Sequence, residues 1–279
     1  MSLTVTGNNY KPIRFSLYIF YENSGQMPGI DILVVTYVND FIWAEYCIKS
    51  LKKFAKGFRN VVLVSDDDGN TVPESLSSIM PMKIVYMKQP DVYPPNLQHR
   101  PGYLWQQYLK LNWMEYTDAD AILVIDSDEM LTKDLSPSDF RDQYGRWRWF
   151  YRDWEYADTA NMWKIPTQEV LKFEPEYEAM CCSLFMFERN TTYRFIEYLK
   201  QIHGASSLWD VFFKYDMKLF SEFNAYGSYV HKFDKEKVYY KVINGSHPTH
   251  FCNHNIHRSW SYGGLNLQDK KRREEIINS

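Results

Sequence analysis

An alternation of apolar runs and helical periodicity between Asp31 and Asp128 constrains the fold more than any other feature. Continuous apolar runs predict buried strands at 31–37, 60–69, 83–87 and 121–126, of which the second runs into an acidic turn. Segments with apolar residues at helical spacing predict helices at 41–55, 73–79 and 103–116. Alternating elements of these lengths indicate an α/β fold: a Rossmann-type, mainly parallel sheet flanked by helices.

The second half of the chain carries weaker signals of the same kind. Strands are predicted at 181–187 and 238–243, and helices at 191–202, 208–220 and 267–277. In the last of these, the run Lys270 to Arg273 is balanced by Asp269, Glu274 and Glu275, so we expect it to form a solvated face. No internal repeat or low-complexity linker divides the 279 residues, which favours a single domain.

Composition excludes several classes of protein. A formal net charge of −3 argues against a generally cationic nucleic-acid binder, and 45% hydrophobic residues argue against bulk disorder. The four cysteines are too few and too irregularly spaced for a disulfide scaffold, so a reducing cytoplasm is the expected setting. Residues 1–29 lack the features of a signal peptide, and no apolar stretch approaches the roughly 20 residues of a membrane span. We expect a soluble, cytoplasmic protein.

Two carboxylates follow the apolar run at 121–125, because the sequence there reads AILVIDSDEM. Asp126 and Asp128 are therefore expected at the carboxyl end of a buried strand, the edge at which open α/β sheets bind ligands. Two carboxylates one residue apart present hard oxygens to a divalent cation that also bridges to phosphate. The motif predicts metal-dependent chemistry on a phosphorylated substrate.

The arrangement resembles a GT-A-type nucleotide-sugar glycosyltransferase with an Asp-x-Asp motif. The resemblance rests on Thr36 in the first strand, the acidic turn Asp66 to Asp68, and Asp-Ser-Asp after the fourth strand. It covers 31–135, the expected nucleotide-sugar-binding half. The segments GYLWQQYLKL (102–111) and SEFNAYGSYV (221–230) are similar to a phage and bacterial group of these enzymes and extend the resemblance into 136–279, the expected acceptor-binding half with the C-terminal tail.

The resemblance implies a role for each matching residue. Asp128 is the expected direct ligand of Mn²⁺ or Mg²⁺, and Asp126 is expected to contact metal, ribose or both. The cation holds the diphosphate of a nucleoside-diphosphate sugar, with a UDP-sugar as the expected donor, and offsets the charge that develops on the leaving group. Asp66 or Asp67 matches the residue that reads the nucleotide base. The other residues expected to bind the donor are Thr36, Tyr37, Gln107 and Lys110.

A histidine cluster is the second notable feature. His247, His250, His254 and His257 lie in a loop-like segment that also contains Cys252. The resemblance implies that one histidine completes the metal shell, and we favour His250 and His247. A separate zinc site is an alternative, although paired cysteines are missing. Hydrogen bonding of these histidines to loop backbone is the other alternative.

The acceptor and the general base are less constrained. The Trp- and Arg-rich segment 144–163 follows the acids and offers flat faces for sugars or bases, although Trp147 and Trp154 are expected to be structural. Asp210 and Glu222 are the candidate bases, and the alternatives are a helix-start charge and a structural hydrogen-bond acceptor. The phage-like resemblance makes a hydroxymethylated base in DNA one candidate acceptor, beside a saccharide, a lipid or a protein.

Two rival functions are open at this point. A haloacid-dehalogenase-like phosphatase also places Asp-x-Asp after a buried strand, but its pattern requires Thr or Val where this chain has Met130, and its acids follow the first core strand. A non-catalytic module that binds sugar or DNA through its aromatic residues is the other rival.

Overall fold

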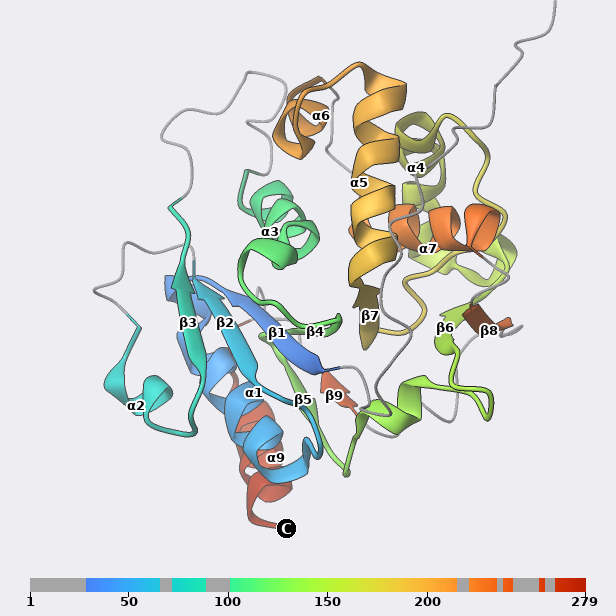
Figure 1. Ribbon diagram of the computed structural model, residues 1–279. Coiled ribbons are helices and arrows are strands. Elements are labelled where there is room, and N and C mark those ends of the chain that lie inside the picture. Colours follow the sequence, from blue (N-terminus) through green and yellow to red (C-terminus); the bar gives the residue numbers. More distant parts are fainter. Residues whose placement is uncertain are drawn as a thin grey trace, which may run out of the picture.

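Five strands form the main sheet of the part of the chain that the structure describes (Figure 1). The computed structural model describes residues 29–65, 72–88, 101–214, 221–234, 238–242, 256–258 and 264–279. The strand order is β3-β2-β1-β4-β7, in which β7 alone is antiparallel to its neighbour. The strands of this sheet are β1 (Ile30–Thr36), β2 (Val61–Ser65), β3 (Lys83–Tyr86), β4 (Ala121–Asp126) and β7 (Phe185–Glu188).

The central strands are buried on both faces, as their continuous apolar sequences predict. Every residue of β1 and β2 is buried, and in β4 only Asp126 is partly exposed. Helices cover both faces because strands without a polar alternation must be shielded on either side. The helices are α1 (Phe41–Phe54), α2 (Glu74–Ser77), α3 (Pro101–Leu111), α4 (Lys164–Leu171), α5 (Arg189–His203), α6 (Leu208–Lys214), α7 (Glu222–Phe233) and α9 (Leu267–Asn278).

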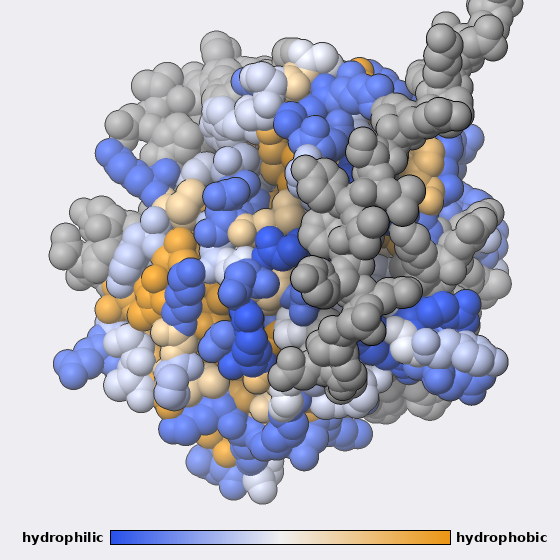
Figure 2. Space-filling model, viewed as in Figure 1, coloured by the Kyte–Doolittle hydropathy of each residue, from blue (hydrophilic) through white to orange (hydrophobic). Residues whose placement is uncertain are grey.

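The helices divide into two layers. Helices α1, α2 and α9 pack together on one side of the sheet, and α3, α5, α6 and α7 pack together on the other (Figure 1). The edge strand β3 is only partly buried, and Figure 2 shows apolar residues at the surface over β2 and β3. One hydrophobic core runs through both halves of the chain, from Ile30 to Val230. The molecule is thus a mixed α/β structure in which the two predicted halves share a core.

The strand order reverses beside β1. The chain runs outward from β1 through β2 to β3 and then returns to the other side of β1 to form β4. In the registers, Val35 lies opposite Asp126, and Thr36 lies opposite Ser65. The carboxyl ends of these strands therefore meet at one edge, and the reversal between β1 and β4 is the place where open α/β sheets leave a crevice for a ligand.

Two small sheets complete the described structure. Strand β5 (Glu129–Leu131) pairs antiparallel with β9 (Ile256–Arg258), and β6 (Trp147–Tyr151) pairs in parallel with β8 (Val238–Val242). The 3-10 helices are Val38–Asp40, Trp113–Glu115, Pro137–Phe140, Trp154–Tyr156 and Asp158–Trp163. Among the described helices, none combines the length and the apolar character needed to cross a bilayer.

Most predicted elements are confirmed, with corrections. Helix α3 ends at Leu111 instead of 116, because the chain tightens into a 3-10 turn that carries Trp113 into the core. The predicted solvated face of the last helix is wrong at Arg273, which is fully buried. Among the described cysteines, Cys182 is disulfide-bonded, while Cys47 and Cys181 are free. Spacing along the sequence did not reveal this disulfide.

Candidate functional site

A buried lysine joins two carboxylates at the carboxyl edge of the sheet. Lys110 Nζ lies 2.7 Å from Asp126 Oδ1 and 3.0 Å from Glu222 Oε1. The side chains of Lys110 and Glu222 are only 4% and 3% exposed, whereas that of Asp126 is 29% exposed. The lysine ammonium also lies 4.9 Å from the ring centroid of Phe223. Three residues predicted for the site therefore meet, with Asp126 on its open side.

Helix α3 places its share of the site on one face. Tyr103, Gln107 and Lys110 are spaced i, i+4 and i+7, which aligns their side chains along one side of a helix. Gln107 Oε1 accepts a hydrogen bond from the backbone N–H of Glu222 at 3.2 Å. This bond anchors the start of α7, where the Ser221 hydroxyl caps the helix by accepting from the N–H of Asn224. Gln107 therefore positions Glu222 instead of facing an open cleft.

The charges of this cluster shift the pKa of Lys110 and that of Glu222. Burial lowers the pKa of the Lys110 ammonium, but Asp126 and Glu222 outweigh burial and raise it above its ordinary value, so Lys110 is charged at neutral pH. Burial raises the pKa of Glu222, the positive charge of Lys110 opposes the rise, and the negative charge of Asp126 adds to it. One cation thus pairs with two carboxylates, and burial makes Glu222 hold its proton more tightly than an ordinary glutamate does.

The end of β1 adds a hydroxyl to this edge. Thr36 is 2% exposed, and its Oγ1 has no hydrogen-bond partner. A buried hydroxyl without a partner is unfavourable unless a ligand or water completes it. Tyr37, the next residue, is 39% exposed. Both residues lie where the resemblance predicts a nucleotide, at the reversal of strand order.

The second acid of the motif lies in the turn between β4 and β5. Asp128 is partly exposed, and its backbone carbonyl accepts a hydrogen bond from Arg273 Nη2. No group of three or more potential metal ligands occurs within the described residues. Two carboxylates nevertheless fit Mg²⁺ or Mn²⁺, which are commonly held by one or two carboxylates while phosphate oxygens and water supply the remaining ligands.

Other predicted site residues lie elsewhere or outside the described structure. Asp210 accepts hydrogen bonds from the backbone of Ser206 and Ser207 at the start of α6, so it corresponds to the helix-start alternative. Among the described residues, His257 alone represents the histidine cluster. It lies in β9 opposite Met130, and burial followed by the charge of Arg273 lowers its pKa. The residues outside the described structure are Asp66, Asp67, His247, His250 and His254.

The aromatic segment after the acids is largely structural. Trp147 and Trp154 are 8% and 7% exposed, which confirms their expected packing role. The prediction missed Tyr103, although its spacing from Gln107 and Lys110 could have revealed it. Burial raises the pKa of Tyr103, and the charge of Glu222 adds to the rise. Tyr103 thus belongs to the same cluster.

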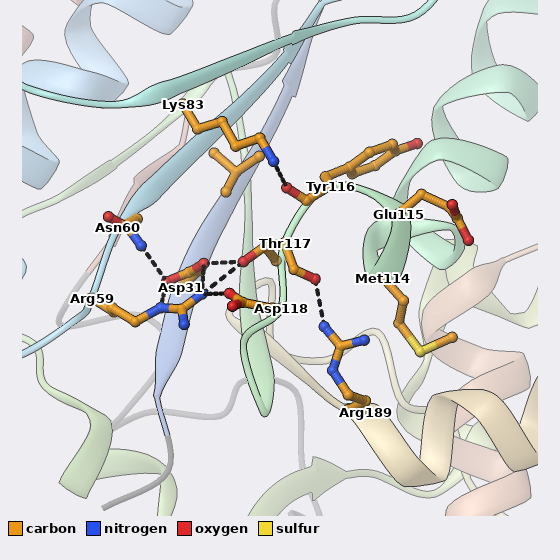
Figure 3. A pocket seen from close by; sticks show the side chains of 11 residues that line it. Asp31, Arg59, Asn60, Lys83, Met114, Glu115, Tyr116, Thr117, Asp118 and Arg189 are labelled. Atoms are coloured by element: carbon orange, nitrogen blue, oxygen red, sulfur yellow. Dashed lines mark hydrogen bonds and ion pairs between the residues drawn. The ribbon is translucent and has the colours of Figure 1, made fainter.

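A separate pocket of about 550 Å³ lies at the opposite edge of the sheet (Figure 3). Its acid, Asp31, is fully buried and accepts two hydrogen bonds from Arg59 at 3.0 Å, one from Asn60 and one from Thr117. Lys83 and Arg189 donate to the backbone carbonyls of Tyr116 and Thr117. Because these charged groups already bond within the protein, the pocket is a weaker candidate for catalysis than the edge at which Asp126 is partly exposed.

Comparison with known proteins adds no assignment: no protein-family model matches the chain, and no curated protein matches it. The functional argument therefore depends on the geometry of the site.

Proposed function

We propose that the protein is a metal-dependent glycosyltransferase that moves a sugar from a nucleoside-diphosphate donor to an acceptor hydroxyl. The observation that supports this most is the position of Asp126. It ends β4 at the reversal of strand order and is held there by Lys110, whose second partner is Glu222. This geometry combines a ligand-binding edge, carboxylates for a cation and a fixed positive charge for phosphate.

Some of these residues would supply charge to the ligand, and others would hold a charged group in position. Asp128, with Asp126, would hold Mn²⁺ or Mg²⁺, which when bound offsets the negative charge on the departing nucleoside diphosphate. Lys110 supplies a second positive charge at the same edge. Glu222 is almost fully buried behind Lys110, so we assign it to positioning that ammonium and not to taking the acceptor's proton. The hydroxyl of Thr36 lies where the nucleotide would bind. A saccharide and a hydroxymethylated DNA base are the acceptors to test first.

The fold argues against the phosphatase alternative. In that class the acids follow the first core strand, whereas here β1 ends in Thr36 and the acids follow β4, the fourth strand along the chain. Residue Met130 also departs from the phosphatase pattern and is buried beside α1 and α9. The paired acids therefore support transfer from a nucleotide sugar better than hydrolysis of a phosphate monoester.

Thermal-shift measurements with nucleotide sugars test the proposal. UDP-, GDP- and dTDP-sugars are compared with and without Mn²⁺, and a CMP-sugar, which has a single phosphate, is the control. One diphosphate donor should raise Tm only when Mn²⁺ is present, because a ligand at 100 times its Kd stabilises the native state by about 2.7 kcal/mol. The shift should disappear in Asp128→Ala. It should persist in Asp118→Ala, which removes a carboxylate from the opposite edge.

Release of nucleoside diphosphate completes the test. Slow hydrolysis of the same donor, dependent on Mn²⁺ and lost in Asp128→Ala, is the result expected of a glycosyltransferase without its acceptor. Binding without any release, even with a panel of acceptors, would instead indicate the non-catalytic module. Failure of every nucleotide sugar to shift Tm with Mn²⁺ would overturn the proposal.

A further inference from the structure

The last helix buries one of its basic residues while exposing the others. In α9, Lys270, Lys271 and Arg272 are exposed, but Arg273 is 0% exposed and Ile276, three residues later, is 6% exposed. The spacing of Arg273 and Ile276 puts them on the same inward face of the helix. Lys53 of α1 fastens the end of α9 by donating to the carbonyls of Ile276 and Ile277, at 3.2 and 2.9 Å. Figure 1 shows α1 and α9 side by side.

The buried guanidinium lies among aromatic rings of α1. Its carbon Cζ is 4.5 Å from the ring centroid of Trp43 and 5.9 Å from that of Tyr46. Arg273 Nη2 donates to the backbone carbonyl of Asp128 at 2.5 Å, while Nε and Nη1 have no hydrogen-bond partner. Burial lowers the pKa of Arg273, but an arginine stays protonated in proteins. A buried cation with two unused donors is unfavourable for stability. The hydrogen bond that Arg273 makes to the Asp128 carbonyl therefore points to a role other than stability.

That bond orients the turn that carries the second acid. Ser127 and Asp128 connect β4 to β5, and β5 is held on α1 by a hydrogen bond from the N–H of Leu131 to the Ser50 hydroxyl at 3.0 Å. The hydrogen bond from Arg273 to the carbonyl of Asp128 fixes the plane of the peptide group between Asp128 and Glu129. Fixing that plane restricts the direction in which the Asp128 side chain leaves the turn. The bond uses the backbone of Asp128 and not its carboxylate.

The two acids of the motif are thus held in different ways. Asp126 is held through its carboxylate by Lys110 from α3, on one side of the sheet. Asp128 is held through its backbone by Arg273 from α9, on the other side. The first arrangement neutralises an acid, whereas the second sets the position of an acid without occupying its ligand atoms.

We propose that Arg273 is a positioning residue that sets the Asp-Ser-Asp turn for a divalent cation from the C-terminal helix. The inference rests on the proposed function, because it takes Asp128 as a metal ligand. Residues that orient metal ligands without touching the metal change metal affinity or activity by about 10–100-fold when replaced. Arg273 acts on Asp128 in this manner, through the backbone.

Binding of Mn²⁺ provides a test that does not depend on turnover. Free and bound Mn²⁺ are distinguished by electron paramagnetic resonance during titration of the wild type, Arg273→Met and Arg273→Lys. The control is Arg272→Met, which removes an exposed arginine from the neighbouring position of the same helix. We expect the Mn²⁺ dissociation constant to rise about 10–100-fold in Arg273→Met. Arg272→Met should bind Mn²⁺ like the wild type.

The lysine variant keeps the test decisive if Arg273→Met does not fold. Lysine retains the positive charge but lacks the planar group that stacks on Trp43 and reaches the carbonyl, so Arg273→Lys should also bind Mn²⁺ more weakly. Donor release should need more Mn²⁺ for half-maximal rate in both variants, with a smaller change in kcat at saturating Mn²⁺. Unchanged Mn²⁺ affinity in a folded Arg273 variant overturns the positioning role alone. Absence of Mn²⁺ binding by the wild type, in the presence of a nucleoside diphosphate, overturns the proposed function and this inference together.

Discussion

The two edges of the main sheet both carry a buried acid and a basic partner, but they use them differently. At the amino edge, Asp31 receives hydrogen bonds from Arg59, Asn60 and Thr117, so its carboxylate is fully engaged by the protein. At the carboxyl edge, Lys110 is shared between Asp126 and Glu222, and Asp126 remains partly exposed. The carboxylate of Asp31 is thus bonded within the protein, whereas that of Asp126 is partly accessible to solvent.

This difference separates the position of the pocket from the position of a polar group that lacks a partner. The amino edge has a cavity of about 550 Å³, yet its charged groups are used to hold β1, β2 and the turn before β4 together. The carboxyl edge adds the Thr36 hydroxyl without a partner and the reversal of strand order. A ligand is therefore expected where the protein leaves polar groups incompletely satisfied.

The largest expected effect comes from removing the central cation of each edge. Lys110→Met leaves two carboxylates without their buried partner and should lower the free energy of unfolding by about 3–5 kcal/mol, measured by urea denaturation. Arg59→Met should cost less, because Arg59 is 38% exposed and Asn60 and Thr117 still bond Asp31. Only Lys110→Met should abolish the Mn²⁺-dependent shift with donor. Retention of that shift in folded Lys110→Met would place the ligand elsewhere.

A substitution in α7 tests how tightly the carboxyl edge is built. A Cβ on Gly227 would lie 2.5 Å from Cβ of Ala179, so Gly227→Ala should force α7 away and lower the free energy of unfolding by about 1–3 kcal/mol. Because α7 carries Glu222, donor affinity should fall as well. Gly102→Ala is the matched control, since a Cβ there meets nothing within 4 Å. Equal stability of the two variants, measured by thermal denaturation, would contradict this packing.

Asp210 and Glu222, the two acids first considered as the base, can be separated by the effects of their substitution. Ser207 accepts from the N–H of Asp210, and Asp210 accepts from that of Ser207, which is a capping box at the start of α6. Ser207→Ala should therefore cost about 1 kcal/mol of stability without changing the rate of donor release. Asp210→Asn should also leave the rate unchanged, whereas Glu222→Gln should lower it. A tenfold loss of rate in Asp210→Asn, with the fold intact, would restore Asp210 as the base.

The smallest expected effect is a difference in the sign of pH dependence. The pKa of Glu222 is raised, first by burial, so its contribution to stability is present below about pH 4 and is lost as pH rises through the folded-state value. The pKa of Asp118 is lowered, first by its hydrogen bond with Arg59, so its contribution is present above about pH 4 and is lost as pH falls. Urea denaturation from pH 3 to 8 checks both signs. The free energy of unfolding of Glu222→Gln should rise relative to that of the wild type as pH rises. The amount by which Asp118→Asn is less stable than the wild type should become smaller as pH falls.

Much of the fold and part of the site could be predicted from the sequence. The apolar run before Asp126 predicted a buried strand and placed the acid at its carboxyl end, because an uninterrupted apolar run indicates a strand that is buried on both faces. The sequence identified both Glu222 and Lys110 as site residues, but nothing in it indicated that they contact each other. The inward position of Arg273 was missed, because a run of four basic residues with acidic neighbours has the composition of an exposed helix face.

The sequence by itself determined the alternation of strands and helices and the place of the two acids after β4, since apolar periodicity and chain order need no distant contact. Tertiary structure alone decided that Lys110 lies between Asp126 and Glu222, that Asp31 is engaged by Arg59, and that Arg273 reaches the carbonyl of Asp128. These pairings join segments far apart in the chain. They depend on which helix covers which face of the sheet, and that is settled by packing the whole core at once.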